Sequence, residues 1–248
     1  YMVIPDPEDK AEQEAFKNKV FTTFERHSRV GMPADKSFIE DVEWLRNQGA
    51  KKVFLKTGAY RPAAVAWTMK VASEAKIDQL TFDGAGGGTG MSPVPMMQEC
   101  STPTVFLEAQ VLKCCEILRK KRRYVPDIVI AGGFVNETQI FKAIALSNFS
   151  KSPYVKAIAT ARAPITAVMK ATHFVEQAQK GKLPGDFKET YGSNPDQFFV
   201  CSTDLKHIYG KDYEKISPGA IGLYSYFVDR IGTGLKQLMA GSRKFKLE

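Results

Sequence analysis

Short apolar runs alternate with longer helix-compatible segments through the middle of the chain. The apolar runs fall at Val53–Leu55, Leu80–Phe82, Ile128–Ile130 and Val155–Ile158. The helix-compatible segments fall at Arg61–Ala75, Val105–Arg122, Thr138–Leu146 and Pro164–Gln179. Apolar strands that alternate with helices are typical of a parallel sheet covered by helices on both faces. The pattern therefore predicts an α/β fold with ligand-binding loops after the carboxyl ends of the strands.

The segments on either side are predicted to be helical. Residues 9–26 are charged and helix-compatible, and residues 35–48 place the apolar side chains of Phe38, Ile39, Val42 and Leu45 on one face. The apolar spacing in residues 218–242 suits a helix that packs on the domain, with an interruption at Gly232 or Gly234. We therefore expect an N-terminal helical segment at 1–50, the strand–helix units at 51–180 and a helical C-terminal extension at 181–248.

Four strand–helix units are half of what a closed (β/α)8 barrel requires, since such a barrel has eight strands in ~250 residues. Half a barrel has two open edges and an exposed face of its core. Either further strands are hidden in the N-terminal segment, or the chain is part of a larger protein. The first residue is Tyr rather than Met, which favours a fragment or a processed chain.

Composition excludes several classes of protein. Apolar residues make up 44% of the chain and charged residues 25%, which is the usual mixture for a globular protein. No stretch approaches the ~18–20 apolar residues of a membrane helix, and the acidic, proline-broken start is not a signal peptide. The four cysteines contain no CxxC pair, and no histidine has the spacing of a metal or hydrolase motif. We expect reduced thiols, a cytoplasmic location and no metal.

The net charge of +8 fits either binding to a nucleic acid or a membrane, or binding of a small anionic ligand. The densest basic run, residues 119–123, ends a predicted helix, where cations suit the helix dipole. No aromatic residues interleave with this run, as a groove for single strands would require. We interpret it as a solvated helix end, so a small anion is the favoured ligand and no nucleic acid is expected.

The strongest local motif is the segment Asp83-Gly84-Ala85-Gly86-Gly87-Gly88-Thr89-Gly90, which directly follows a buried strand. Its glycines can expose backbone N–H groups and allow a ligand to approach closely. It is not a phosphate-binding P-loop, because no Lys-Ser/Thr pair follows the last glycine. The alternative is a flexible surface loop, but a loop in this position is typical of ligand binding.

Two further strand ends carry candidate binding residues. Gly132 and Gly133 follow the third strand, and Ala161 and Arg162 follow the fourth. Small residues beside one arginine at a helix start can form a phosphate site. Lys56, at the end of the first strand, must reach an anion or water. The alternatives are plain tight turns, a surface arginine and a lysine that extends into solvent.

These loops resemble those of a known family. The segments ASEAKIDQLTFDGAGGGTGMSP, VPDIVIAGGFVNETQIFKAIAL and KTGAYRP resemble the flavin barrel of glutamate synthases. The C-terminal stretch GAIGLYSYFVDRIGTGLKQLMAGSRKF is similar to the tail of the FMN-binding glutamate synthase-related proteins. The resemblance covers approximately residues 30–245.

The resemblance implies the C-terminal half of a TIM barrel that holds FMN at the carboxyl ends of its strands. It implies that Lys56 lies near the flavin, and that Arg61 is a candidate for binding the substrate carboxylate. The cofactor-binding residues that it implies are Lys56, Asp83, Gly87, Gly88, Thr89, Gly90, Gly132, Gly133, Ala161 and Arg162. The implied activity is the reduction of a 2-imino or 2-oxo acid to an amino acid with electrons passed through FMN.

The sequence also departs from the family. Residues 161–181 contain no cysteine, whereas glutamate synthases carry a three-cysteine iron–sulfur loop there, and no N-terminal cysteine nucleophile is present. The first half of the barrel is missing, so a partner chain or a longer protein is expected to complete it, and a homo-oligomer is possible. Two other functions stay open: a non-catalytic barrel subunit, and a phosphate-binding lyase or synthase without flavin.

Overall fold

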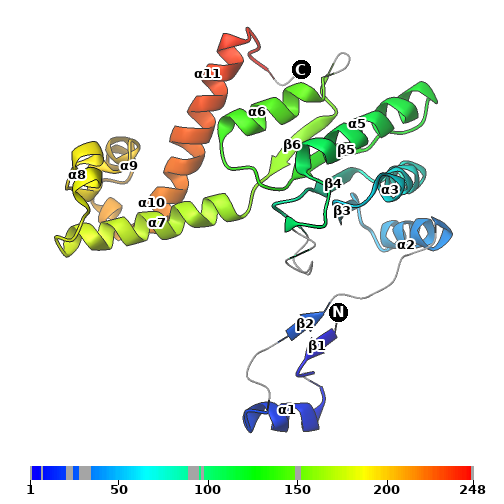
Figure 1. The fold of residues 1–248 in the computed structure, drawn as a ribbon, viewed down its shortest axis with the longest axis horizontal. Coiled ribbons are helices and arrows are strands. Elements are labelled where there is room, and N and C mark those ends of the chain that lie inside the picture. The colour runs from blue at the N-terminus through cyan, green and yellow to red at the C-terminus, as the bar shows by residue number, and fades with distance from the viewer. Residues whose placement is uncertain are drawn as a thin grey trace. The chain divides into compact units, whose positions relative to one another are not determined.

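The computed structural model describes residues 2–6, 8–20, 25–27, 35–88, 95, 98–148 and 152–246, and the structural statements below refer to these residues. The chain divides into two compact units, Tyr1–Ile128 and Val129–Glu248. A four-stranded sheet has the order β3-β4-β5-β6 (Figure 1). The strands are β3 (Phe54–Gly58), β4 (Gln79–Asp83), β5 (Asp127–Ala131) and β6 (Val155–Ala159). All four predicted strands are therefore confirmed, and each extends one to three residues beyond its apolar run.

The first unit is built around strands β3 and β4, which pair in parallel with Leu55 opposite Leu80. Helix α3 (Pro62–Glu74) connects them, and α5 (Thr104–Lys120) follows β4 and packs on α3. The fully buried side chains of Met69, Ile77, Phe82 and Leu107 form the centre of its core. Helix α2 (Asp35–Asn47) packs on α3.

Polar groups fix the amino ends of these strands. The Asp78 carboxylate accepts a hydrogen bond from the backbone N–H of Val53 at 2.9 Å. The guanidinium of Arg46 donates to the backbone carbonyls of Ala75 at 2.8 Å and Lys76 at 2.6 Å. These side chains satisfy backbone groups just before β3 and in the turn before β4, so they have a structural role at the amino end of the sheet.

The N-terminal segment differs from the prediction. Helix α1 (Lys10–Lys17) ends long before residue 26, and Glu25–His27 instead forms strand β2, which pairs antiparallel with β1 (Met2–Ile4). No residue of α1 is buried, so no tertiary packing extends the helix, and the left-handed Lys19 at φ 61° follows its end. In α2, Val42 is buried as predicted, whereas Leu45 is exposed.

Helix α5 confirms its predicted range within two residues at each end but not its predicted face. The apolar spacing of residues 105–122 predicts an inward face made of Phe106, Ala109, Leu112 and Leu118, but Phe106 and Ala109 are exposed. The buried apolar positions are Leu107, Val111 and Cys115, together with Leu112 from the predicted face. The helix is apolar on two sides, and the apolar spacing alone cannot decide which of the two faces the sheet.

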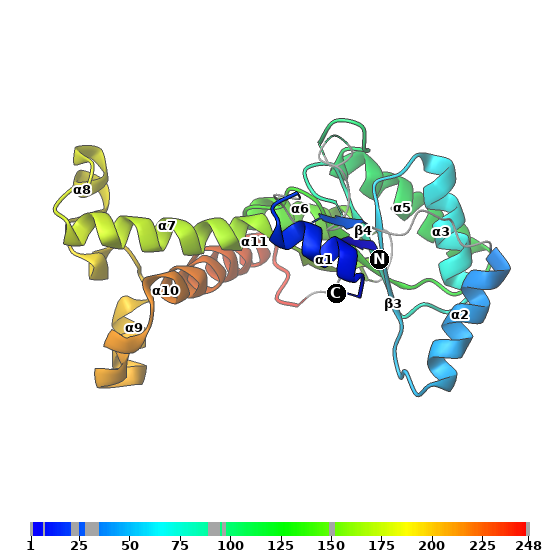
Figure 2. The ribbon, with the colours of Figure 1, turned by 90° about the horizontal axis from the view of Figure 1, so that it is seen from below.

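The second unit contains α6 (Glu137–Leu146), α7 (Arg162–Gln179), α8 (Gly185–Tyr191) and α9 (Ser202–Tyr209). The chain then continues through α10 (Pro218–Ser225), the π-helical segment η3 (Tyr226–Gly232) and α11 (Thr233–Gly241). The tail is helical as predicted, but it does not break at Gly232 or Gly234: Gly232 has helical backbone angles, and the α geometry instead changes to π at Tyr226. Figures 1 and 2 show α8 at the C-terminal end of α7 and α10 alongside α7. Cys201, Leu205 and Ile221 form a small core between α9 and α10.

Candidate functional site

Lys56 and Asp83 form an ion pair between neighbouring strands, with 2.8 Å from Nζ to Oδ2. The side chain of Asp83 is only 5% exposed, whereas that of Lys56 is 48% exposed. Lys56 therefore compensates a buried carboxylate while its ammonium group stays accessible to a ligand. The predicted position of Lys56 at a strand end is wrong, because β3 continues to Gly58 and places Lys56 in mid-strand.

The first part of the glycine loop is held against the start of α5. The backbone N–H of Ala85 donates to the Thr102 carbonyl at 3.0 Å, and the Thr104 hydroxyl donates to the Ala85 carbonyl at 3.1 Å. A Cβ atom on Gly84 would lie 2.6 Å from the Thr104 Cα, a distance that no side chain can adopt. Close approach of two backbones is thus the reason for a glycine here.

Beyond Gly84 the loop requires backbone conformations that favour glycine. Gly86 has a φ of 85° and Gly88 a φ of 141°, and the N–H of Gly87 closes a tight turn on the Gly84 carbonyl at 3.0 Å. The described half of the loop therefore forms a tight turn that depends on glycine. Thr89 and Gly90, which were also predicted to bind the cofactor, lie outside the described residues.

The loop after β3 reaches the same place in the first unit. Thr102 donates its N–H to the Ala59 carbonyl at 3.2 Å and its hydroxyl to the Tyr60 carbonyl at 3.2 Å. Arg61 follows as the exposed N-cap residue of α3. The structure thus brings together the ends of β3 and β4, the glycine loop and the start of α5 around the Lys56–Asp83 pair.

Within the second unit, the ends of the neighbouring strands β5 and β6 carry the predicted phosphate-binding residues. Gly132 and Gly133 have φ values of 114° and 79°, so both need the conformational freedom of glycine. Ala161 is the N-cap of α7, with no side-chain cap and no acidic residue in the first turn of the helix. Arg162 begins this helix and is exposed. Uncapped N–H groups and one arginine are suited to an anion.

The C-terminal tail braces the segment after Gly133. The Tyr226 hydroxyl donates to the Val135 carbonyl at 2.9 Å, and Arg230 Nε lies 3.5 Å from Glu137 Oε2. Gly234 packs so closely on the Glu137 side chain that no Cβ atom would fit. The π-helical segment therefore fixes the start of α6, two to four residues beyond the glycine turn. The sequence analysis did not identify these contacts, because they join residues that lie about ninety positions apart.

The same tail packs on α7 through small residues. A Cβ atom on Gly222 would lie 3.1 Å from the Ala167 carbonyl oxygen and would overlap the Ala171 side chain. A Cβ atom on Gly219 would lie 2.9 Å from Val168 Cγ1. The two helices approach more closely than side chains at these positions would allow, so α10 holds α7 in a fixed position.

Glu108 is a buried acid that the sequence analysis missed. Its side chain lies in α5 and the residue is 2% exposed. Its Oε1 atom has no hydrogen-bond partner within the described residues. Burial raises the pKa of this carboxyl to about 7. Its place in the apolar spacing of α5 was the only signal in the sequence, and an acid at such a position is not normally predicted to face inward.

Within the described ranges, the cysteines and the other potential metal ligands do not form a metal site. No group of three His, Cys, Asp or Glu side chains there could hold a metal ion. All four cysteines are free, and burial raises the pKa of Cys115 to about 12 and that of Cys201 to about 11. Both thiols thus stay protonated at neutral pH.

No helix in the described part of the chain is long and apolar enough to cross a membrane.

Comparison with protein families identifies the chain. The family described as the conserved region in glutamate synthase matches residues 30–153, which is half of the chain. The chain belongs to this glutamate synthase family. The matched segment includes Lys56, Asp83, the glycine loop and the turn at Gly132, and it ends before Arg162. A comparison with curated proteins found no significant match.

Proposed function

We propose that this glutamate synthase family member is an FMN-dependent oxidoreductase that reduces a 2-imino or 2-oxo acid to an amino acid. Family membership over residues 30–153 carries the proposal. We also propose a cytoplasmic location, which the free thiols support, and a fold that is half of a (β/α)8 barrel. The predicted division at residues 50 and 180 remains a prediction.

The second unit fits the phosphate end of FMN. Gly132 and Gly133 bring backbone close to a ligand without side chains in the way, and the uncapped start of α7 offers N–H groups at Ala161 and Arg162. The absence of an acidic side chain from the first turn of α7 removes the group that would repel a phosphate. In the proposal, Arg162 adds a charge-assisted hydrogen bond to this anion.

The first unit fits the ring end of FMN. When bound, the flavin would supply the redox chemistry. The Lys56 ammonium is held by Asp83, so it presents a fixed positive charge where an electron-rich ring can be stabilised. In the proposal, Gly87, Gly88, Thr89 and Gly90 provide a surface without bulky side chains for the ring and the substrate.

Arg61 is the proposed ligand of the substrate carboxylate. Arg61 is exposed at the start of α3, three residues after the carboxyl end of β3. A guanidinium binds a carboxylate through two parallel hydrogen bonds, which a lysine cannot reproduce. In the FMN-loaded protein, Arg61→Lys should therefore raise the KM for the 2-oxo acid without changing the affinity for FMN.

The alternative function is a barrel subunit that binds flavin only with a partner chain. One observation favours it: Phe54, on the edge strand β3, is 60% exposed on the same side of the strand as Lys56. The outer edge of β3 also presents backbone groups with which a strand of another chain can pair. The two proposals differ in whether this chain alone retains flavin.

The test is the visible absorbance spectrum of the purified chain after loading with FMN and removal of the excess. The proposal expects a retained flavin band in the wild type and in Arg123→Gln, a control that removes an exposed arginine from the end of α5. Arg162→Gln should lower the affinity for FMN roughly tenfold or more, because a hydrogen bond to a charged group is lost. The absence of a flavin band from the wild type would overturn the proposal and favour the partner-dependent alternative.

A further inference from the structure

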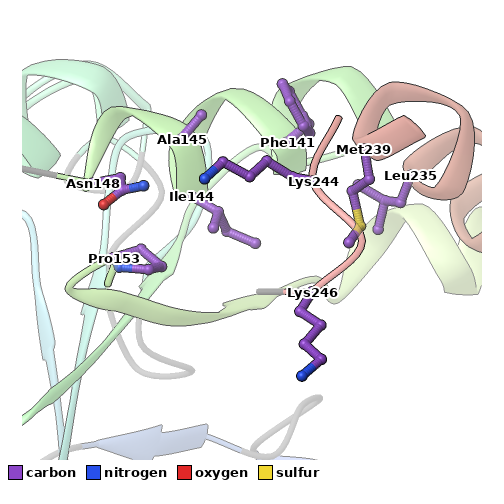
Figure 3. A pocket seen from close by; sticks show the side chains of 9 residues that line it. All are labelled: Phe141, Ile144, Ala145, Asn148, Pro153, Leu235, Met239, Lys244 and Lys246. Atoms are coloured by element: carbon purple, nitrogen blue, oxygen red, sulfur yellow. The ribbon is translucent and has the colours of Figure 1, made fainter. Parts of the chain in front are cut away.

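Helices α6 and α11 enclose a pocket of about 310 Å³ on the second unit (Figure 3). This size is at the small end of ligand pockets, which span roughly 300–1,000 Å³. Its walls are apolar side chains from both helices and from the segment just before β6: Phe141, Ile144, Ala145, Leu235, Met239 and Pro153. The pocket does not include the carboxyl ends of the strands, so it is separate from the proposed flavin site.

The polar groups at this pocket are few and are either basic or neutral. Lys244, in the segment after α11, extends across the mouth toward Ala145, and the Asn148 amide lies at the far end (Figure 3). Lys246 also borders the pocket, but its side chain points away from the apolar walls. No acidic side chain is among the lining residues that the structure describes. The pocket therefore combines an apolar interior with positive charge at its mouth.

The position of Lys244 is set by the end of α11. Arg243 has a φ of 55°, and the Lys244 N–H donates to the Met239 carbonyl at 2.9 Å, which turns the chain back toward α6. The lysine stem can then cover the apolar walls while its ammonium group meets a ligand head group. A carboxylate at the mouth would accept a charge-assisted hydrogen bond from this exposed ammonium group, whereas an uncharged apolar ligand would not.

We propose that this pocket binds a small amphipathic carboxylate, such as a straight-chain acid of about eight carbons, with its chain between α6 and α11 and its carboxylate at Lys244. Each buried methylene adds about 0.8 kcal/mol, equivalent to about fourfold in affinity, so lengthening the chain from hexanoate to octanoate should tighten binding about fifteenfold. Octanol should bind more weakly than octanoate, because it offers no charge to Lys244.

The test follows the ¹³C-methyl resonance of Met239 during titration of the whole chain with octanoate. Met239→Leu assigns the signal. Lys244→Met should weaken octanoate binding about fivefold and leave octanol binding unchanged, because it removes one exposed charge contact and keeps the apolar stem. Ala145→Phe should abolish binding of both by filling the pocket.

Two control variants distinguish a change in the pocket from the general effect of losing a charge or adding an aromatic ring. Lys236→Met removes an exposed charge from α11 outside the pocket, and Ala240→Phe adds the same ring to the exposed side of that helix. Both should bind octanoate as the wild type does. The proposal is overturned if octanoate produces no saturable shift, if chain length has no effect, or if Lys244→Met and Lys236→Met weaken binding equally. FMN retention is measured separately and is independent of each result.

Discussion

Gly84 is the residue at which the glycine loop meets the start of α5. A Cβ atom there would lie 2.6 Å from the Thr104 Cα, which is backbone and cannot rotate away. The loop must therefore move if any side chain is introduced. This makes Gly84, which the sequence analysis did not place among the binding residues, a determinant of the loop position.

We expect Gly84→Ala to lower the free energy of unfolding by about 1–3 kcal/mol, the usual cost of overpacking. Urea denaturation followed by circular dichroism measures it. Gly185→Ala is the matched control, because no atom lies within 4 Å of a Cβ atom at that position. The same loss in both variants would contradict the steric explanation.

Glu108 makes a prediction about pH. Its folded-state pKa of about 7 lies above the ordinary value of 4.5 for a glutamate, so the folded protein holds this proton more tightly than the unfolded chain does. Stability from this group is complete below about pH 4.5 and is lost as the pH rises toward 7. In the limit of full burial, a pKa difference of this size between the folded and unfolded states corresponds to about 3 kcal/mol in the free energy of unfolding.

Glu108→Gln should therefore be more stable relative to the wild type at pH 8 than at pH 5, by about 2–3 kcal/mol. The amide keeps the shape of the carboxyl group and does not ionise. Urea midpoints of both proteins at the two pH values give the difference. If the stability difference between the two proteins is the same at pH 5 and pH 8, folding does not raise the pKa of Glu108.

At the scale of elements, the tail from α10 to α11 is a brace for α6 and α7. It contacts α7 through Gly219 and Gly222, and it contacts the start of α6 through Tyr226 and Gly234. Helix α7 begins at the proposed phosphate-binding residue Arg162, and α6 begins four residues after Gly133. The tail therefore positions the proposed anion site without contributing a side chain to it.

We expect Gly222→Ala to destabilise the chain by about 1–3 kcal/mol, because the methyl group would overlap Ala171. Gly241→Ala, in the same tail with no neighbouring atom within 4 Å, should have no cost and can gain up to ~1 kcal/mol from helix propensity. Thermal unfolding of the two variants measures the contrast. Equal stability of both variants would show that close packing of α10 on α7 is unimportant.

Much of the fold was predictable from the sequence because it follows from local patterns. Continuous apolar runs predicted all four strands, and the apolar spacing in the tail predicted its helix. The wrong predictions concern features that depend on contacts between residues distant in the sequence. The inward face of α5 depends on which of two apolar stripes meets the sheet, and residues 25–27 form a strand only because β1 pairs with them.

The candidate site was predictable in part. Glycines at positive φ and the Lys56–Asp83 pair occur where the sequence placed binding residues. The bracing contacts of Tyr226 and Glu137 were not predictable, because they depend on tertiary packing of the tail.

At the scale of the whole molecule, the central claim is that this glutamate synthase family chain holds FMN by its phosphate. The most direct measurement compares the affinities of the purified wild-type chain for FMN and riboflavin by quenching of flavin fluorescence. The phosphate-binding account predicts at least about tenfold tighter binding of FMN, because riboflavin lacks the charged group that Gly132, Gly133 and Arg162 are proposed to hold. Equal affinity for the two flavins, or no binding of either, would contradict it.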